Sequence, residues 1–123
     1  MRASFKTIAI FLGSTALAIA PSGAVAQSNS PPVANPNSLS IYVCQTVTIN
    51  LTGNDTDPEG NYPLTVTAVD STPYANVSIA SASSVTFEGV SPGGQTLTYT
   101  VQDSLGASST GLISLGVFAH SCA

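Results

Sequence analysis

The chain has 123 residues, and only 7% of them are charged. Its only basic residues, Arg2 and Lys6, lie at the N-terminus, whereas all six acidic residues lie beyond residue 54. This balance excludes DNA, RNA and anionic membranes as partners, because the later part of the chain has no lysine or arginine with which to neutralise phosphate.

Residues 1–26 are predicted to be a secretory signal peptide. The two basic residues precede an apolar run at residues 8–20, and small residues at 24–26 precede Gln27. This is the three-part signal-peptide pattern, and we expect cleavage after Ala26. The apolar run is too short for a comfortable membrane-spanning helix. The sequence therefore predicts a secreted product, located in the periplasm, at the cell surface or outside the cell.

Residues 27–36 are predicted to form a proline-rich leader, and residues 37–123 a single domain. The leader, QSNSPPVANP, is expected to be flexible or to adopt a polyproline-like conformation. The domain is long enough to bury one hydrophobic core.

Seven short alternating runs in the domain predict β-strands, and no segment has the pattern of a helix. In residues 46–51 and 96–102, apolar side chains alternate with polar ones, as in strands that bury one face. The predicted fold class is therefore all-β, a seven-stranded antiparallel β-sandwich. The predicted strands are residues 39–43, 46–51, 64–69, 76–80, 85–87, 96–102 and 112–118.

The last predicted strand, residues 112–118, is apolar on both faces. Such a strand is covered on both sides, either by the core and a neighbour or by a contact between copies of the chain. An ordinary strand with a few exposed apolar side chains is the simpler interpretation.

The two cysteines, Cys44 and Cys122, are predicted to form a disulfide because the chain is secreted. Closing a loop of this length is worth about 4 kcal/mol in the chain-entropy model. In a sandwich whose first and seventh strands end on the same side, both cysteines meet there. The disulfide would then fasten the C-terminal tail to the turn between the first two strands.

The segment at residues 54–66, NDTDPEGNYPLTV, carries three acidic side chains across a Pro-Gly turn. Its spacing follows the opening of an EF-hand calcium loop, but the twelfth position is Val66 instead of glutamate, and Pro58 interrupts the pattern. Two interpretations remain open. Either the acids bind calcium, or residues 57–60 form a type I turn whose acidic side chains are solvated.

Enzymatic activity is not expected. His120 is the only histidine, it lies beside the C-terminal cysteine, and no nucleophile, base and orienting group form a pattern around it. Exposed aromatic side chains can hold sugars, which makes Tyr42, Tyr62 and Tyr74 candidates for carbohydrate binding. Since the chain has no tryptophan, packing at the core or edge is the simpler role for each tyrosine.

Residues 31–66 and 98–117 resemble the bacterial cadherin-like and Ig-like repeats of large surface adhesins. The most specific parts are NDTDPEGN at 54–61, LTVTAV at 64–69 and TYTVQDSLGA at 98–107. The resemblance implies an Ig-like or cadherin-like β-sandwich that acts as a non-enzymatic adhesion or structural module. Its partner would be a protein or a glycan on a surface.

The same resemblance implies a calcium site. In that family the acidic loop and the aspartate after the TYTV strand can lie close together and bind calcium. The candidate ligands in this chain are Asp55, Asp57, Glu59, Asn61 and Asp103.

Two other functions remain open. The chain could be a subunit of a homopolymeric fibre, in which the leader or the apolar last strand pairs with a neighbour's sheet edge. It could also be a small carbohydrate-binding protein.

Overall fold

The computed structural model describes residues 28–122, so the predicted signal peptide lies outside the described residues. All seven predicted strands are present, and the last two begin three and four residues earlier than predicted. The strands are β1 (Asn37–Tyr42), β2 (Thr46–Asn50), β3 (Thr65–Val69), β4 (Ala75–Ile79), β5 (Ser84–Gly89), β6 (Gly93–Gln102) and β7 (Ser108–Phe118). A single 3-10 turn, η1 (Thr52–Asn54), is the only helical element in the described part. No described helix could span a membrane.

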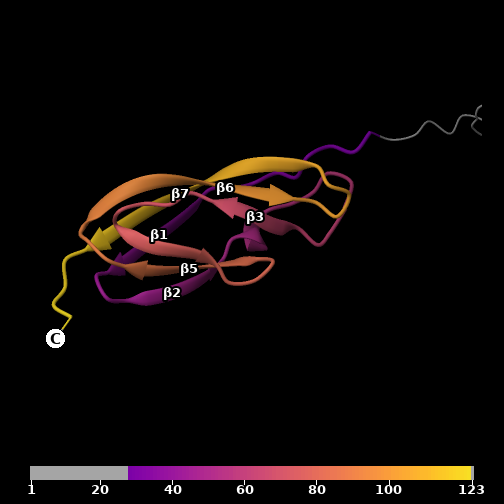
Figure 1. Cartoon of the computed structure of the whole chain (residues 1–123). Coiled ribbons are helices and arrows are strands. Elements are labelled where there is room, and N and C mark those ends of the chain that lie inside the picture. The colour runs from indigo at the N-terminus through magenta and orange to yellow at the C-terminus, as the bar shows by residue number, and fades with distance from the viewer. Residues whose placement is uncertain (1–27, 123) are drawn as a thin grey trace, which may run out of the picture.

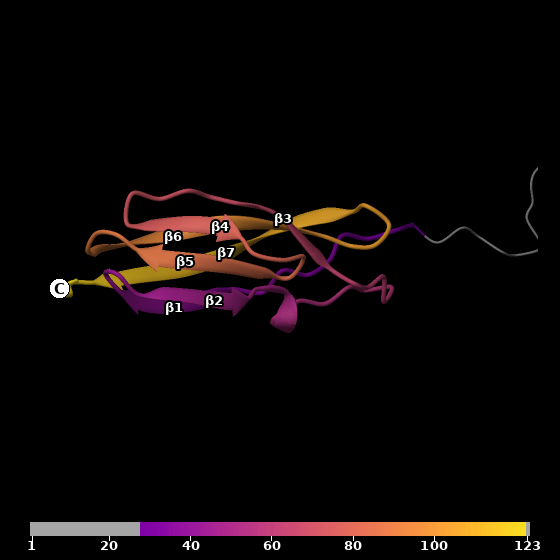
Figure 2. The same cartoon turned by 60° about the horizontal axis from the view of Figure 1, so that its bottom comes forward.

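The strands form two packed sheets, as Figures 1 and 2 show. One sheet has the order β1-β7-β6-β3, and the other has the order β2-β5-β4. The prediction of a purely antiparallel sandwich is wrong at one pair, because β1 pairs with β7 in parallel. The two strands must run the same way, since Cys44 follows β1, Cys122 follows β7, and the two cysteines form a disulfide as predicted.

The hydrophobic core lies between the sheets and follows the predicted alternation. In β7, Ile113, Leu115 and Val117 are buried, whereas Leu112 and Phe118 are half exposed on the outer face. The strand is paired on one side with β1 and on the other with β6. Fully buried side chains of the core are Ile41, Leu51, Val85, Phe87, Leu97, Tyr99, Val101 and Ile113.

The elongated sandwich has two chemically different ends. At the disulfide end, which we define as residues 42–45, 89–93 and 118–122, the chain reaches its C-terminus (Figure 1). At the acidic end, defined as residues 28–36, 52–63 and 103–107, the leader enters the domain (Figure 2). The predicted metal ligands all belong to the acidic end.

Candidate metal centre

The acidic loop contains the turn that the sequence predicted at residues 57–60. The Gly60 N–H donates to the Asp57 carbonyl over 3.1 Å, and Gly60 has the positive φ of 76° that favours glycine. The Asp57 Oδ2 accepts from the N–H groups of Glu59 and Asn61 at 3.1 and 2.9 Å. Asp57 is only 7% exposed, so its carboxylate is not simply solvated.

Asp103 occupies a similar position in the loop between β6 and β7. Its Oδ1 accepts from the Leu105 and Ala107 N–H groups, each at 2.9 Å, and the residue is buried. Burial raises the pKa of Asp103, but hydrogen bonding from Ala107, Asn29, Leu105 and Gly106 outweighs it and holds the pKa below its ordinary value. Asp103 is therefore ionised at neutral pH.

Hydrogen bonds join these two loops to each other and to the leader. The Ser104 N–H donates to the Asn61 carbonyl at 3.0 Å, and the Asn61 Nδ2 donates to the Asn29 Oδ1 at 2.8 Å. The Ser30 N–H donates to the Glu59 Oε1 at 3.1 Å. A hollow of about 220 Å³ lies between the segments, lined by Ser28, Asn29, Glu59, Asn61 and Leu105.

Two carboxylate oxygens in the joined loops are buried without a hydrogen-bond partner. They are Oδ1 of Asp57 and Oδ2 of Asp103. Leaving an ionised oxygen unpaired in the interior is costly, and a bound cation is one remedy. Carboxylate and amide oxygens are what calcium prefers, so these residues fit the ion.

The acidic side chains alone do not complete a calcium shell. Within residues 28–122, no group of three or more His, Cys, Asp or Glu side chains gathers in metal-binding geometry. Calcium takes 6–8 oxygen ligands in general. Any site here would therefore combine the two aspartates with amide or carbonyl oxygens and water.

Asp55 lies in a separate network, although it is two residues from Asp57. Its Oδ1 accepts from the Asn35 N–H at 2.8 Å, and its Oδ2 accepts from the Tyr99 hydroxyl at 2.9 Å. Burial raises the pKa of Asp55, and the hydrogen bonds from Asn35 and Tyr99 offset this only in part. Burial and the neighbouring Asp55 also raise the pKa of Tyr99, which keeps its proton. Asp55 therefore fastens the leader to the core.

Tyr99 was predicted from the sequence only as an inward-facing core side chain. The structure gives it a second role, in the hydrogen-bond network of the acidic end. Its ring is fully buried, and its hydroxyl contacts the carboxylate of Asp55 and accepts from the Asn37 Nδ2 at 3.3 Å. A signal was available, because a tyrosine at an inward position of a strand needs a hydrogen-bond partner for its hydroxyl.

The three candidate tyrosines for sugar binding are spread over the molecule. The Tyr62 hydroxyl accepts from the Asp57 N–H at 3.0 Å and supports the acidic loop. Tyr74 is partly buried against the core. Tyr42 is half exposed at the disulfide end, where His120 is also exposed.

Comparison with known proteins identifies a family. The family model described as "Bacterial Ig domain" matches residues 29–116. No curated protein matches the chain.

The fold is also found in solved structures. An endo-fucoidan hydrolase of glycoside hydrolase family 107 aligns with a TM-score of 0.50 and 19% identity over 94% of this chain and 16% of the hydrolase. A nucleoside hydrolase-related hypothetical protein from Saccharophagus degradans gives a TM-score of 0.49 and 19% identity over 73% of this chain and 26% of that one. The PKD domain of the KIAA 1837 protein gives a TM-score of 0.44 and 15% identity, over 81% of this chain and 97% of that domain. The chain therefore spans a minor part of both hydrolase-related proteins.

Proposed function

Because this chain belongs to the bacterial Ig domain family, we propose that it is a secreted, non-enzymatic adhesion or structural module whose acidic end is stabilised by calcium. Within residues 28–122 the single histidine, the exposed His120, and the acidic loop lie at opposite ends of the sandwich. The partner would be a protein or a glycan on a surface.

One observation carries the calcium proposal. The Asp57 and Asp103 carboxylates each use one oxygen to hold their own loop and leave the other buried and unpaired. The Asn61–Ser104 hydrogen bond places the two loops side by side. A calcium ion held by these aspartates, with Glu59 and Asn61 beside the hollow, would neutralise the charges and tie the loops together.

The proposed ligand set omits Asp55 because both of its oxygens already have partners in the protein. Calcium bound to Asp57 and Asp103 would stabilise only the folded chain, since the two loops are far apart in an unfolded one. The result would be a rigid acidic end in a calcium-containing medium.

The test is thermal unfolding of the purified protein, expressed from its full sequence with the disulfide intact, in millimolar calcium and in chelator. A ligand at about 100 times its dissociation constant stabilises by roughly 2.7 kcal/mol, which raises the midpoint by about 10 °C for a domain of this size. We expect Asp57→Asn and Asp103→Asn each to remove the shift. The matched control is Glu88→Gln, which changes an exposed acid on β5 and should retain it.

No shift in the unaltered protein, or an undiminished shift in both aspartate variants, would contradict the calcium proposal. Magnesium is a useful second metal. It requires a small, nearly ideal octahedral shell, which these loops would provide less readily than the larger and more variable shell of calcium.

The fibre-subunit alternative finds less support in the fold. Residues 30, 33 and 35 of the leader already donate backbone hydrogen bonds to the acidic loop, and β7 is paired on both sides within the chain. Assembly would have to use the edge strands, which are β1 and β3 in one sheet and β2 and β4 in the other. Growth of the sedimentation coefficient with protein concentration would favour this alternative.

A further inference from the structure

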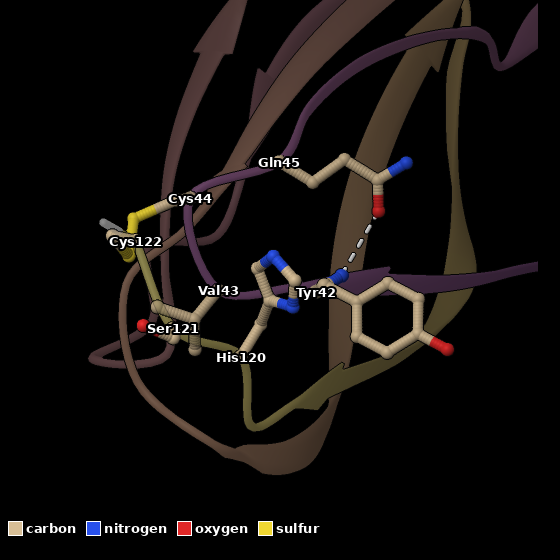
Figure 3. Close-up of a pocket in the computed structure, with 7 residues that line it drawn as sticks. All are labelled: Tyr42, Val43, Cys44, Gln45, His120, Ser121 and Cys122. Carbon is tan, nitrogen blue, oxygen red and sulfur yellow. Dashed lines mark hydrogen bonds between the residues drawn. A yellow bond between two sulfur atoms is a disulfide. The ribbon is translucent and has the colours of Figure 1, made fainter.

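The disulfide end contains a hollow that the calcium proposal does not use. Its volume is about 360 Å³, which is within the range of small-molecule binding pockets. Figure 3 shows that its walls come from the turn after β1 and from the C-terminal tail, which the disulfide holds together. The lining residues are Tyr42, Val43, Cys44, Gln45, His120, Ser121 and Cys122.

The Tyr42 ring lies between two other aromatic rings beside this hollow, and we name Tyr42, Phe118 and His120 the aromatic platform. Tyr42 and Phe118 are paired in register across β1 and β7 and point outward, each 54% exposed. The Tyr42 ring centroid lies 6.2 Å from that of Phe118 and 5.7 Å from that of His120. Exposed apolar ring faces gathered at one place are typical of a contact surface for a ligand or partner.

The backbone beneath the platform is held firmly. The Tyr42 N–H donates to the Gln45 Oε1 at 2.9 Å, and the Val43 N–H donates to the Phe118 carbonyl at 2.9 Å. The Cys44 N–H donates to the Gly89 carbonyl at 2.8 Å, which supports the left-handed backbone of Cys44 at φ 72°. A site held in this way loses little conformational entropy when it binds a ligand.

The polar groups around the hollow include no acid, lysine or arginine. The bond from the Tyr42 N–H fixes the Gln45 amide at one side of the hollow, as Figure 3 shows. The tyrosine hydroxyl, the His120 ring and the Ser121 hydroxyl add further donors and acceptors. None of the lining residues is an acid, and residues 28–122 contain no lysine or arginine.

The surface next to the platform is rich in hydroxyl groups. Ser38 and Ser40 of β1 and Ser114 of β7 are exposed on the same outer face. An apolar peptide would prefer a continuous apolar surface, which these serines interrupt. A sugar presents an apolar ring face together with hydroxyl groups, so it matches aromatic rings bordered by neutral hydrogen-bonding groups.

We propose that the aromatic platform and the hollow beside it form a binding site for a neutral glycan. Anionic glycans are disfavoured, because the acids of the domain have no basic residues to offset them. This inference deepens the proposed adhesion role by naming the chemistry of the partner, and it rests on that role. It does not depend on the calcium proposal, which concerns the opposite end of the sandwich.

The test is affinity electrophoresis of the purified protein in native gels that contain neutral polysaccharides, namely a β-glucan, a xylan, a mannan and dextran. Sulfated fucoidan serves as the anionic probe. We expect retardation by at least one neutral polysaccharide and none by fucoidan. Tyr42→Ala and Phe118→Ala should each weaken retention at least ten-fold, whereas Tyr42→Phe should change it by less than about three-fold because the ring remains.

The matched control is Leu112→Ala, which removes an exposed apolar side chain from β7 on the same face and should leave retention unchanged. Unaltered thermal midpoints show that each variant is folded. The proposal is overturned if no neutral polysaccharide retards the protein, or if retention survives both Tyr42→Ala and Phe118→Ala. It is also overturned if these variants dissolve a dimer seen by sedimentation, because a second copy then covers the platform.

Asp57→Asn separates the two proposals. Loss of the calcium shift with unchanged glycan retention in this variant supports both proposals. If the unaltered protein shows no calcium shift, the glycan proposal still stands, and if it shows no glycan retention, the calcium proposal still stands.

Discussion

The two ends of this sandwich are closed by different chemistry. At the disulfide end a covalent bond joins Cys44 to Cys122, and the side chains that line the hollow there include no acid, lysine or arginine. At the acidic end the described residues contain no disulfide, and hydrogen bonds to Asp55, Asp57 and Asp103 hold the leader and two loops. One fold therefore combines an end closed by a covalent bond with an end held by hydrogen bonds to carboxylates, the end for which we propose a response to calcium.

This difference has a common cause in composition. Because residues 28–122 have no lysine or arginine, a buried carboxylate cannot be neutralised by an ion pair with either residue. Backbone N–H groups and the Tyr99 hydroxyl take that role, and two oxygens are left over. The acidic end is thus the place where we propose that calcium acts.

The largest expected effect comes from removing the covalent bond. The double variant Cys44→Ala, Cys122→Ala opens a loop with a sequence separation of 78, and we expect about 4 kcal/mol less stability in urea unfolding. The calcium shift at the far end should persist in folded protein. The control is the unaltered protein in a strong reductant, which should unfold at the same urea concentration as the double variant. A loss of unfolding free energy below about 1 kcal/mol would mean that the disulfide adds little to stability.

A smaller loss is expected from the hydrogen-bond network of the acidic end. Tyr99→Phe keeps the buried ring but removes the hydroxyl from Asp55, and a buried acceptor left without its donor costs about 2 kcal/mol. Tyr62→Phe is the matched control. It removes the hydroxyl that accepts from the Asp57 N–H, but the Tyr62 ring is exposed, so we expect a smaller loss of unfolding free energy than in Tyr99→Phe. Equal losses in urea unfolding of the two variants would show that burial of the network is unimportant.

The smallest effect is expected from pH. The folded pKa of Asp103 lies below its unfolded value of 3.8, so its contribution to stability is present above that pH and is lost as pH falls through the folded pKa. Asp55 has the opposite sign, because its raised pKa makes protonation favour the folded chain as pH falls towards 3.8.

Urea unfolding between pH 6 and pH 2 checks these signs. Asp103→Asn should flatten the loss of stability in acid, whereas Asp55→Asn should steepen it. The assignment of the two carboxylates is wrong if both variants change the acid dependence in the same direction.

Much of the fold could be predicted from sequence because strand formation is governed by local alternation. Residues 46–51 and 96–102 show their buried faces directly, and all seven strands lie where their patterns indicated. The parallel pairing of β1 with β7 was not expected, although the disulfide already required the two strands to end on the same side. Strand partners lie far apart in sequence, so alternation does not specify them.

The candidate site was predictable only in part. The resemblance brought Asp57, Asn61 and Asp103 to attention together, and the structure joins their loops through the Asn61–Ser104 bond. The resemblance could not show that Asp55 and Asp57 belong to different hydrogen-bond networks. Asp55 is held by Asn35 of the leader and by the buried hydroxyl of Tyr99, and both lie far from it in the sequence. Nor did any pattern group Tyr42 with Phe118 and His120, which lie 76 and 78 positions away in the chain.

By itself the sequence determined the strand positions, the disulfide, the buried faces of the strands and the absence of lysine and arginine from residues 28–122. These features follow from residue types and short-range spacing. The tertiary structure alone decided which carboxylate oxygens are buried without partners and which aromatic rings share one surface. Both depend on how loops from distant parts of the chain pack at the two ends of the sandwich, where no repeating pattern constrains the side chains.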